Sequence, residues 1–200
     1  MRSKGDAVLA LEQRLDALHY DVGPIDGKFD WQTWQGVVAF QKVNGLKRSG
    51  KVTTETQQLI ANSPAPGSLL PSGGKERIEV DITRQVLMLF HDNTLFKVVA
   101  ISSGSGRKYC QPSKLTQNQN CGDARTPRGN FKIQRRIPGW RESDLGKLYN
   151  PLYFNGGFAI HGAPSVPAGP ASHGCVRIPM GVAEWFPQEV RNGTPVYIFD

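Results

Sequence analysis

The 200-residue sequence contains no long hydrophobic run, few charged residues and only three cysteines. Charged side chains make up 20% of the chain and aromatic ones 9%, and this balance excludes a wholly disordered protein. No stretch approaches the run of about 18 apolar residues that a spanning helix needs, so we expect no membrane span within this chain. The N-terminus lacks the apolar segment of a secretory signal, so any signal or anchor for export is expected to be absent from this chain.

Acidic residues are outnumbered, with 17 Asp and Glu against 24 Lys and Arg, which gives a net charge of +7. Seven of the basic residues lie between Arg125 and Lys147. Two interpretations stay open: an anionic partner such as an acidic wall polymer, and a surface that serves only solubility. Nucleic acid is not predicted as a partner, because no helix carries clustered bases and no alternation of aromatic and basic residues appears.

The three cysteines differ in their surroundings. Cys110 and Cys121 flank ten residues rich in Gln and Asn, whereas Cys175 stands apart from them. We predict one disulfide, Cys110–Cys121, and one functional thiol, which implies an oxidising compartment. Three reduced thiols in a cytosolic protein are the alternative. If the bridge forms, we expect a reductant to lower thermal stability and to leave the reaction intact.

A segment rich in Pro, Gly and Ser divides the chain. It reads NSPAPGSLLPSGG over residues 62–74, and residues 63–74 are predicted to be a linker. Residues 1–62 show apolar residues at helical spacing and predict a small three-helix unit, with helices around residues 11–18, over residues 31–43 and from about residue 53. In residues 75–200 the apolar period changes to two, which predicts mainly antiparallel strands and one helix near residues 181–190. The expected fold class is therefore α+β, with long loops over residues 104–128 and 162–172.

The densest chemistry lies in the segment SHGCVR at residues 172–177. A cysteine beside a glycine at the start of a strand can expose its sulfur, but a thiol near neutral pH needs a base to become a good nucleophile. His161 ends a separate predicted strand, and adjacent strands lie about 4.8 Å apart, so we assign His161 as the base of Cys175. His173 is only two residues from the sulfur, and we expect its side chain to point away from it.

Two plainer interpretations compete with catalysis. A lone cysteine is usually a small buried apolar residue. Two histidines and a thiolate also suggest zinc, but zinc normally takes a further carboxylate or cysteine, and none lies near either segment. We therefore predict no metal and no cofactor.

The motifs together resemble a known family. The segment IHG at residues 160–162, followed by SHGCVR, is similar to the signature of the L,D-transpeptidases, the YkuD-type enzymes of bacterial peptidoglycan. The segments IEVDITRQVLMLFHDN, VVAISSGSG, TPRGNFKI and GTPVYIF support the resemblance. Residues 11–60, with a DG turn, an FQ pair and a GL step, resemble the three-helix peptidoglycan-binding module. The two matches cover nearly the whole chain.

The resemblance implies a β-sandwich catalytic domain and a mechanism. Cys175, activated by His161, would attack the carbonyl of the third residue of a tetrapeptide stem and expel the terminal D-alanine. An amine of a second stem would then form a 3→3 cross-link. Backbone N–H groups around His173, Gly174 and Cys175 would stabilise the oxyanion, and the carbonyl of Gly162 would orient His161.

The resemblance also implies partners. Ser172 would shape the pocket, while Arg177 and Tyr153 are candidates for contact with substrate; a salt bridge for Arg177 and core packing for Tyr153 are the alternatives. Expected partners are the stem peptides and glycan of peptidoglycan, with carbapenem-type β-lactams as covalent inhibitors, in the extracytoplasmic cell envelope of a bacterium. An L,D-carboxypeptidase and a non-catalytic wall-binding protein remain the alternative functions.

Overall fold

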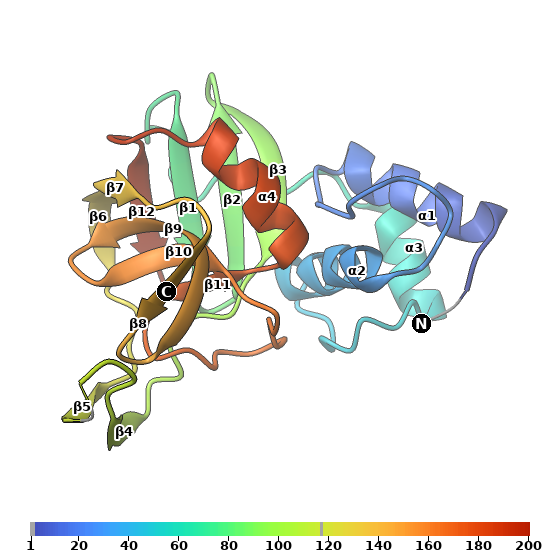
Figure 1. Ribbon diagram of the computed structural model, residues 1–200. Helices are drawn as coiled ribbons and strands as arrows, with labels where there is room; N and C mark the ends of the chain where they lie inside the picture. Colours follow the sequence, from blue (N-terminus) through green and yellow to red (C-terminus); the bar gives the residue numbers. More distant parts are fainter. Residues whose placement is uncertain (1–2, 117) are drawn as a thin grey trace.

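The structure, a computed structural model, describes residues 3–116 and 118–200. Three helices, α1 (Asp6–Ala17), α2 (Trp31–Val43) and α3 (Thr54–Asn62), precede the strands, and α4 (Met180–Glu189) lies near the C-terminus. The three-helix unit occupies one end of the molecule, and the strands form the other (Figure 1). No helix in these described ranges is long and apolar enough to cross a membrane.

Most strands form two sheets. The first has the order β3–β2–β1–β12–β6, with β1 (Arg77–Asp81), β2 (Val86–His91), β3 (Thr94–Ala100), β6 (Gly129–Lys132) and β12 (Pro195–Phe199). The second has the order β11–β10–β9–β7, with β7 (Arg135–Arg136), β9 (Gly146–Asn155), β10 (Phe158–Gly162) and β11 (Val176–Ile178); β8 (Trp140–Ser143) also pairs with β9. Pairing is mostly antiparallel, but β1 and β12, and β10 and β11, run parallel. The predicted α+β class is confirmed.

The central core lies between the two sheets and α4. It is built from the inward residues of both sheets, and three buried side chains of α4 complete it. From the first sheet come Ile78, Val80, Leu87, Leu89, Val99, Ile101, Val196 and Ile198; from the second come Leu152, Phe154, Ile160, Val176 and Ile178; from α4 come Val182, Ala183 and Phe186. This packing fixes the position of β10, which carries the histidine of the predicted site, and of β11, which follows the cysteine directly.

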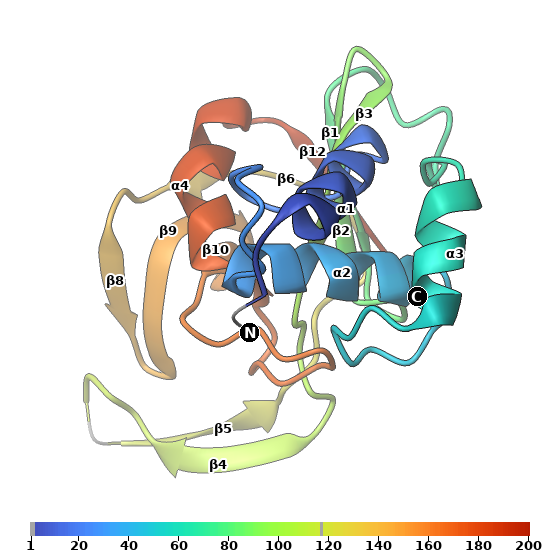
Figure 2. The ribbon, with the colours of Figure 1, turned by 90° about the vertical axis from the view of Figure 1, so that its right-hand side faces the viewer.

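A second core joins the helical unit to the outer face of the first sheet. Val86, Met88 and Phe90 of β2 point away from the central core and pack with residues of α1, α2 and α3. Both faces of β2 are therefore covered, which explains why its sequence VLMLF is a continuous apolar run and not an alternating one. Figure 2 shows the three helices in front of β2 and β3.

Residues 63–74 contain no helix or strand and follow the surface of the molecule closely. The buried carboxylate of Glu79 accepts hydrogen bonds from the Ser68 hydroxyl and the Leu69 N–H, both at 2.6 Å. Arg14 of α1 donates to the Ser63 carbonyl oxygen at 2.9 Å. The segment is thus held at its start and in its middle, and its predicted role as a boundary between two domains stays a prediction.

One predicted loop is wrong. Residues 104–128 contain a two-stranded hairpin, β4 (Lys108–Pro112) and β5 (Gln119–Asp123), which projects from the rest of the molecule (Figures 1 and 2). Cys110 lies directly opposite Cys121 in its register, and a disulfide joins them. The hairpin has little buried surface, so its sequence carries none of the apolar alternation by which strands are recognised.

Candidate active site

The register of β10 and β11 brings His161 and Cys175 to one face of the second sheet. Ile160 pairs with Val176, and His161 pairs with Arg177, in a parallel arrangement. Cys175, immediately before β11, therefore comes beside Ala159 and shares its face, because directly paired residues point the same way and side chains alternate along each strand. The alternate residues Ile160 and Val176 are fully buried in the central core. Packing of one face thus presents the histidine and the cysteine on the other.

The His161 ring is fixed in orientation. Its side chain is almost fully buried, and Nδ1 lies 2.9 Å from the carbonyl oxygen of Gly162. Since a carbonyl only accepts, Nδ1 carries the hydrogen and Nε2 keeps a free lone pair. Burial lowers the pKa of His161 to about 4, against the opposing effect of the Gly162 bond and with a further lowering by the charge of Arg177. The imidazole is therefore neutral at pH 7.

The Cys175 thiol is also neutral at rest. The side chain is half-buried, and its Sγ lies 3.9 Å from the carbonyl oxygen of Gly157. Burial raises the pKa of the Cys175 thiol, although a hydrogen bond from the Ala159 backbone and the charge of Arg177 act in the opposite direction. The thiol of Cys175 and the imidazole of His161 are therefore both uncharged at pH 7.

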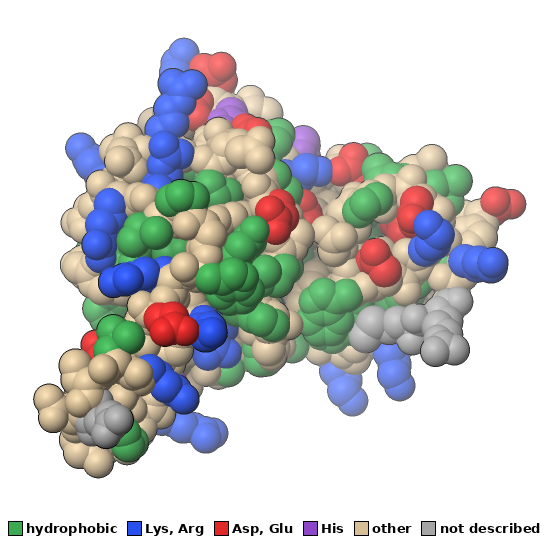
Figure 3. Space-filling view, viewed as in Figure 1, with side chains coloured by type: hydrophobic (Ala, Val, Ile, Leu, Met, Phe, Trp, Pro, Cys, Tyr) green, Lys and Arg blue, Asp and Glu red, His purple; other side chains and the backbone are tan. Residues whose placement is uncertain are grey.

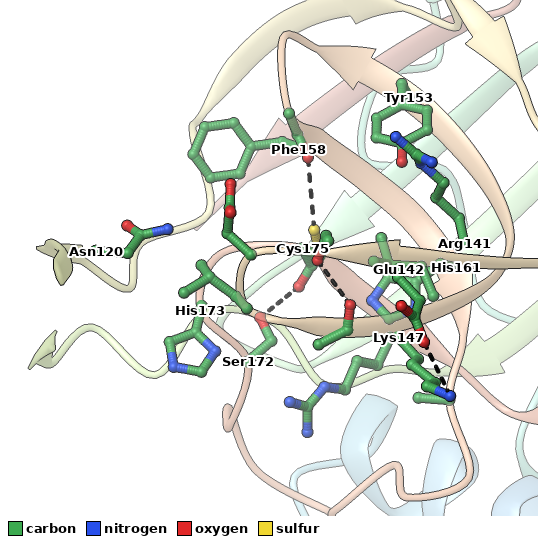
Figure 4. Close-up of a pocket in the computed structure, with 18 of the residues that line it drawn as sticks. Asn120, Arg141, Glu142, Lys147, Tyr153, Phe158, His161, Ser172, His173 and Cys175 are labelled. Atoms are coloured by element: carbon green, nitrogen blue, oxygen red, sulfur yellow. Dashed lines mark hydrogen bonds and ion pairs between the residues drawn. The ribbon is translucent and has the colours of Figure 1, made fainter. Parts of the chain in front are cut away.

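The turn from residue 172 to residue 175 is closed by its own hydrogen bonds. The Ser172 hydroxyl donates to the Cys175 carbonyl oxygen at 2.5 Å and accepts from the Gly174 N–H at 2.9 Å (Figure 4). The Thr126 hydroxyl supports the same turn: it donates to the Gly174 carbonyl oxygen at 2.7 Å. The Gly174 N–H is thus already bonded to Ser172, which leaves it out of the oxyanion donors that the sequence suggested.

Only glycine fits position 174. Its φ is +134°, in the region that L side chains rarely adopt. A Cβ there would lie 2.5 Å from Cε1 of Phe158 and 3.0 Å from the Arg125 carbonyl oxygen. The close approach of these two segments seats the cysteine turn against the rest of the sheet.

The side chain of His173 points away from the sulfur, as expected, but not because of its position on a strand. Residues 172–175 form a turn, not a strand, and two residues that are two positions apart on a strand would in any case share a face. The ring of His173 is nevertheless directed away from the sulfur (Figure 4). It packs edge-on against Tyr109 of the hairpin, with ring centroids 4.8 Å apart.

These residues line one cavity of about 620 Å³, a size suited to a small organic ligand. Six of the residues predicted from the sequence contribute to its wall: Tyr153, His161, Ser172, His173, Cys175 and Arg177. Gly162 and Gly174 lie next to it, at the end of β10 and inside the turn. The structure thus brings the predicted site residues together, apart from the two bridged cysteines, which lie on the hairpin.

The hairpin forms a wall of this cavity that the sequence analysis missed. Tyr109, Leu115, Asn120 and Asp123, all between residues 108 and 123, line it. The hairpin also reaches the turn between β8 and β9, where the Lys114 N–H donates to the Asp144 carbonyl oxygen at 2.8 Å. No motif marked these residues; the disulfide pair that frames them was the one available signal.

The opposite wall carries several charges. Arg135, Arg141, Glu142 and Lys147 line the cavity, and three of them belong to the basic cluster noted in the sequence. On the face drawn in Figure 3, Lys and Arg side chains are spread around the β-rich part and interspersed with acidic ones. The basic excess therefore gives no continuous patch on this face, but it does supply cations to the cavity.

The structure bears on the two alternatives to substrate contact, a salt bridge for Arg177 and core packing for Tyr153. Arg177 forms no salt bridge with any carboxylate in residues 3–116 and 118–200, so the predicted structural ion pair is not present there. Tyr153 is 5% exposed and packs in a small cluster with Leu148 and Ala159, while the guanidinium of Arg135 lies 4.1 Å from the centre of its ring. Tyr153 is thus both a packing residue and part of the cavity wall.

Comparison with known proteins gives two family matches. Residues 75–198 match the model described as the L,D-transpeptidase catalytic domain, and residues 4–60 match the one described as a putative peptidoglycan binding domain. The comparison with curated protein sequences yields no match.

Solved structures extend these matches to the whole chain. A crystal structure of the L,D-transpeptidase from Xylanimonas cellulosilytica is 36% identical, with a TM-score of 0.88, over 99% of this chain and 95% of that one. A second, the L,D-transpeptidase (Yku) from Stackebrandtia nassauensis, is 22% identical with a TM-score of 0.53, over 99% and 93% of the two chains, and shows the fold alone.

Proposed function

Because the chain belongs to the L,D-transpeptidase family, with a peptidoglycan-binding module at its N-terminus, we propose that Cys175 is the nucleophile of an acyl transfer on peptidoglycan stems. The observation that carries the proposal is the shared face of His161 and Cys175 in the cavity, with Nδ1 of the histidine bonded to the Gly162 carbonyl oxygen. This bond leaves Nε2 as the acceptor of the thiol proton. No acidic third residue is needed.

The first half of the reaction forms an acyl-enzyme. His161 takes the proton of Cys175 as the sulfur attacks the carbonyl carbon of the third residue in a tetrapeptide stem. The backbone N–H groups of His173 and Cys175 stabilise the oxyanion, a contribution that typically amounts to about 2.7–4 kcal/mol for one donor. The imidazolium then returns its proton to the leaving amine, and D-alanine departs from a thioester on Cys175.

In the second half, an amine of another stem attacks the thioester. His161 accepts the proton of this amine and gives it to the sulfur as the C–S bond breaks, which gives a 3→3 cross-link and restores the neutral thiol and imidazole. Arg177 and the cationic wall at Arg135, Arg141 and Lys147 suit the carboxylates of stem peptides, since these guanidinium and ammonium groups face the cavity. The activity belongs to the extracytoplasmic cell envelope, where stems and glycan are found.

The test separates transfer from hydrolysis. Purified tetrapeptide stems incubated with the protein should give cross-linked dimers, detected by their masses. Tripeptides alone would assign an L,D-carboxypeptidase, in which water takes the place of the acceptor amine.

A second experiment separates an enzyme from a binding protein. A carbapenem should add its mass to the protein and fail to do so in Cys175→Ala. The absence of both an adduct and any change in the stems would support the non-catalytic wall-binding alternative.

A further inference from the structure

We infer that the N-terminal helical unit positions the active-site turn, and that Lys42 of α2 is the main positioning residue. This inference goes beyond a role of the helices in wall binding. It rests on a chain of hydrogen bonds that leads from α2, through the first sheet, to the turn before Cys175.

The chain begins with a buried lysine. Lys42 is 2% exposed, and its Nζ donates to the carbonyl oxygens of Gln85 at 3.0 Å and Ile101 at 2.8 Å. Burial lowers the pKa of Lys42 to about 7, and the charge of Arg48 lowers it further. Burying an ammonium group is costly unless it is hydrogen-bonded, and here both bonds go to residues close to the next contact: Gln85, which makes it, and Ile101, two residues before Ser103.

The next link is the side chain of Gln85. Its amide accepts from the Ser103 N–H at 2.8 Å and donates to the Ser103 hydroxyl at 2.6 Å. Gln85 has a φ of +66°, a conformation that costs energy for a residue with a side chain, and the Lys42 bond to its carbonyl holds it there.

The last link reaches the cysteine turn. The Ser103 carbonyl oxygen accepts from the N–H groups of Ala171 and Ser172, both at 2.9 Å. Ser172 in turn bonds to the Cys175 carbonyl oxygen and the Gly174 N–H. Displacement of Ser103 would therefore move the residue that closes the turn.

A second set of contacts holds the loop before the turn. Gln35 of α2 donates to the Val166 carbonyl oxygen at 3.3 Å, and Arg48 donates to the carbonyl oxygens of Ala168 at 3.4 Å and Thr83 at 3.0 Å. The helical unit thus contacts the 163–171 segment, which joins His161 to Cys175, independently of Lys42.

The test compares Lys42→Met with Lys47→Met. Methionine keeps much of the length of the lysine side chain but cannot donate, and Lys47 is an exposed lysine of the same region. At a temperature well below the melting point of both variants, Lys42→Met should lower kcat for D-alanine release about tenfold or more, with KM within about twofold. Lys47→Met should match the wild type.

A purely structural role predicts a different outcome. In that case Lys42→Met would melt at a lower temperature but retain the kcat of the wild type, and the inference would be overturned. If Lys42→Met does not fold, Gln85→Met decides in its place, because it removes the two bonds to Ser103 and keeps the carbonyl that Lys42 contacts. It should lower kcat about threefold to tenfold, and an unchanged kcat would overturn the inference.

The kcat measurement rests on the proposed function. The rate at which Cys175 is alkylated gives a second measurement that does not. Iodoacetamide alkylates Cys175 without any substrate, and mass spectrometry gives the rate while the Cys110–Cys121 bridge stays intact. Lys42→Met should change this rate severalfold relative to Lys47→Met. If the wild type is inactive on stems but the two variants differ in alkylation rate, only the proposed function is contradicted. Equal alkylation rates in the two variants would contradict the positioning role.

Discussion

At the scale of single residues, burial keeps the two groups that we propose for the reaction, His161 and Cys175, uncharged. His161 is neutral because burial holds its pKa near 4, and Cys175 is a thiol because burial raises its pKa. A thiolate–imidazolium pair would require the reverse: a raised pKa for His161 and a lowered pKa for Cys175. Proton transfer during attack is the alternative that these environments favour.

The pH profile of the free enzyme tests this. A neutral His161 is needed as base, so activity is present above its folded pKa and is lost as the pH falls through it. We expect the acid limb of kcat/KM near pH 4 rather than near the ordinary imidazole value. Recovery of activity on return to pH 7 is the control against unfolding, and a reversible limb near pH 6.5 would show that the histidine is hydrated.

Gly174→Ala tests the requirement for glycine in the cysteine turn. The added Cβ meets both an unfavourable φ and the ring of Phe158, so we expect a loss of about 1–3 kcal/mol in the free energy of unfolding and slower alkylation of Cys175. Gly169→Ala is the matched control, since its Cβ would meet no atom within 4 Å. Equal unfolding midpoints for the two variants would contradict this account.

At the scale of elements, the β4–β5 hairpin changes what the disulfide is expected to do. The sequence alone led to the expectation that a reductant would leave the reaction intact. Because Tyr109 and Asp123 line the cavity and His173 packs on Tyr109, the hairpin is now expected to contribute to substrate binding as well as to stability.

The double variant Cys110→Ser/Cys121→Ser tests this revision. Loss of the cross-link frees a loop of ten residues, so we expect a melting temperature several degrees lower and a KM for stems raised about threefold to tenfold. The alkylation rate of Cys175 by iodoacetamide should stay within about twofold, since the turn itself is held by Ser172 and Thr126. An unaltered KM would restore the original expectation.

Some strands could be predicted from the sequence and others could not, and the reason is burial. Strands such as β2 and β10 bury their side chains, so burial left an apolar pattern that predicts them. The β4–β5 hairpin buries little and is held by a covalent bond and by its contact with Asp144, neither of which has a periodic signature. His161 and Cys175 were found because their chemistry is local to short motifs. Lys42 was missed, because its partners are backbone carbonyls 43 and 59 residues away.

At the scale of the whole molecule, the helical unit and the β-rich part share a hydrophobic core. The helices cover the face of the first sheet that carries Val86, Met88, Phe90 and Val98. The segment rich in Pro, Gly and Ser predicted a linker between two domains but left open whether the domains contact each other. In the structure residues 63–74 follow the surface, and the two parts pack together.

Removal of the helices tests whether the β-rich part depends on the shared hydrophobic core. We expect residues 63–200 alone to aggregate or to bind the dye ANS, because their sheet would expose a broad apolar face to water. The intact chain should unfold in a single calorimetric transition. Two separate transitions, or a soluble and folded fragment, would show that the two parts are independent.

A rigid union also limits where the enzyme can act. If a flexible linker joined two separate domains, Cys175 could reach stems over a wide range of distances from the site at which the helices bind peptidoglycan. Tyr20 and Phe40 pack against the outer face of the first sheet, and the inner face of that sheet packs against the second sheet, where Cys175 precedes β11. The distance between the helical unit and the sulfur is therefore set during folding. If the helices bind peptidoglycan and Cys175 joins stems as proposed, only stems that lie at this fixed distance from the bound strand can react, so the architecture of the polymer selects which stems are joined.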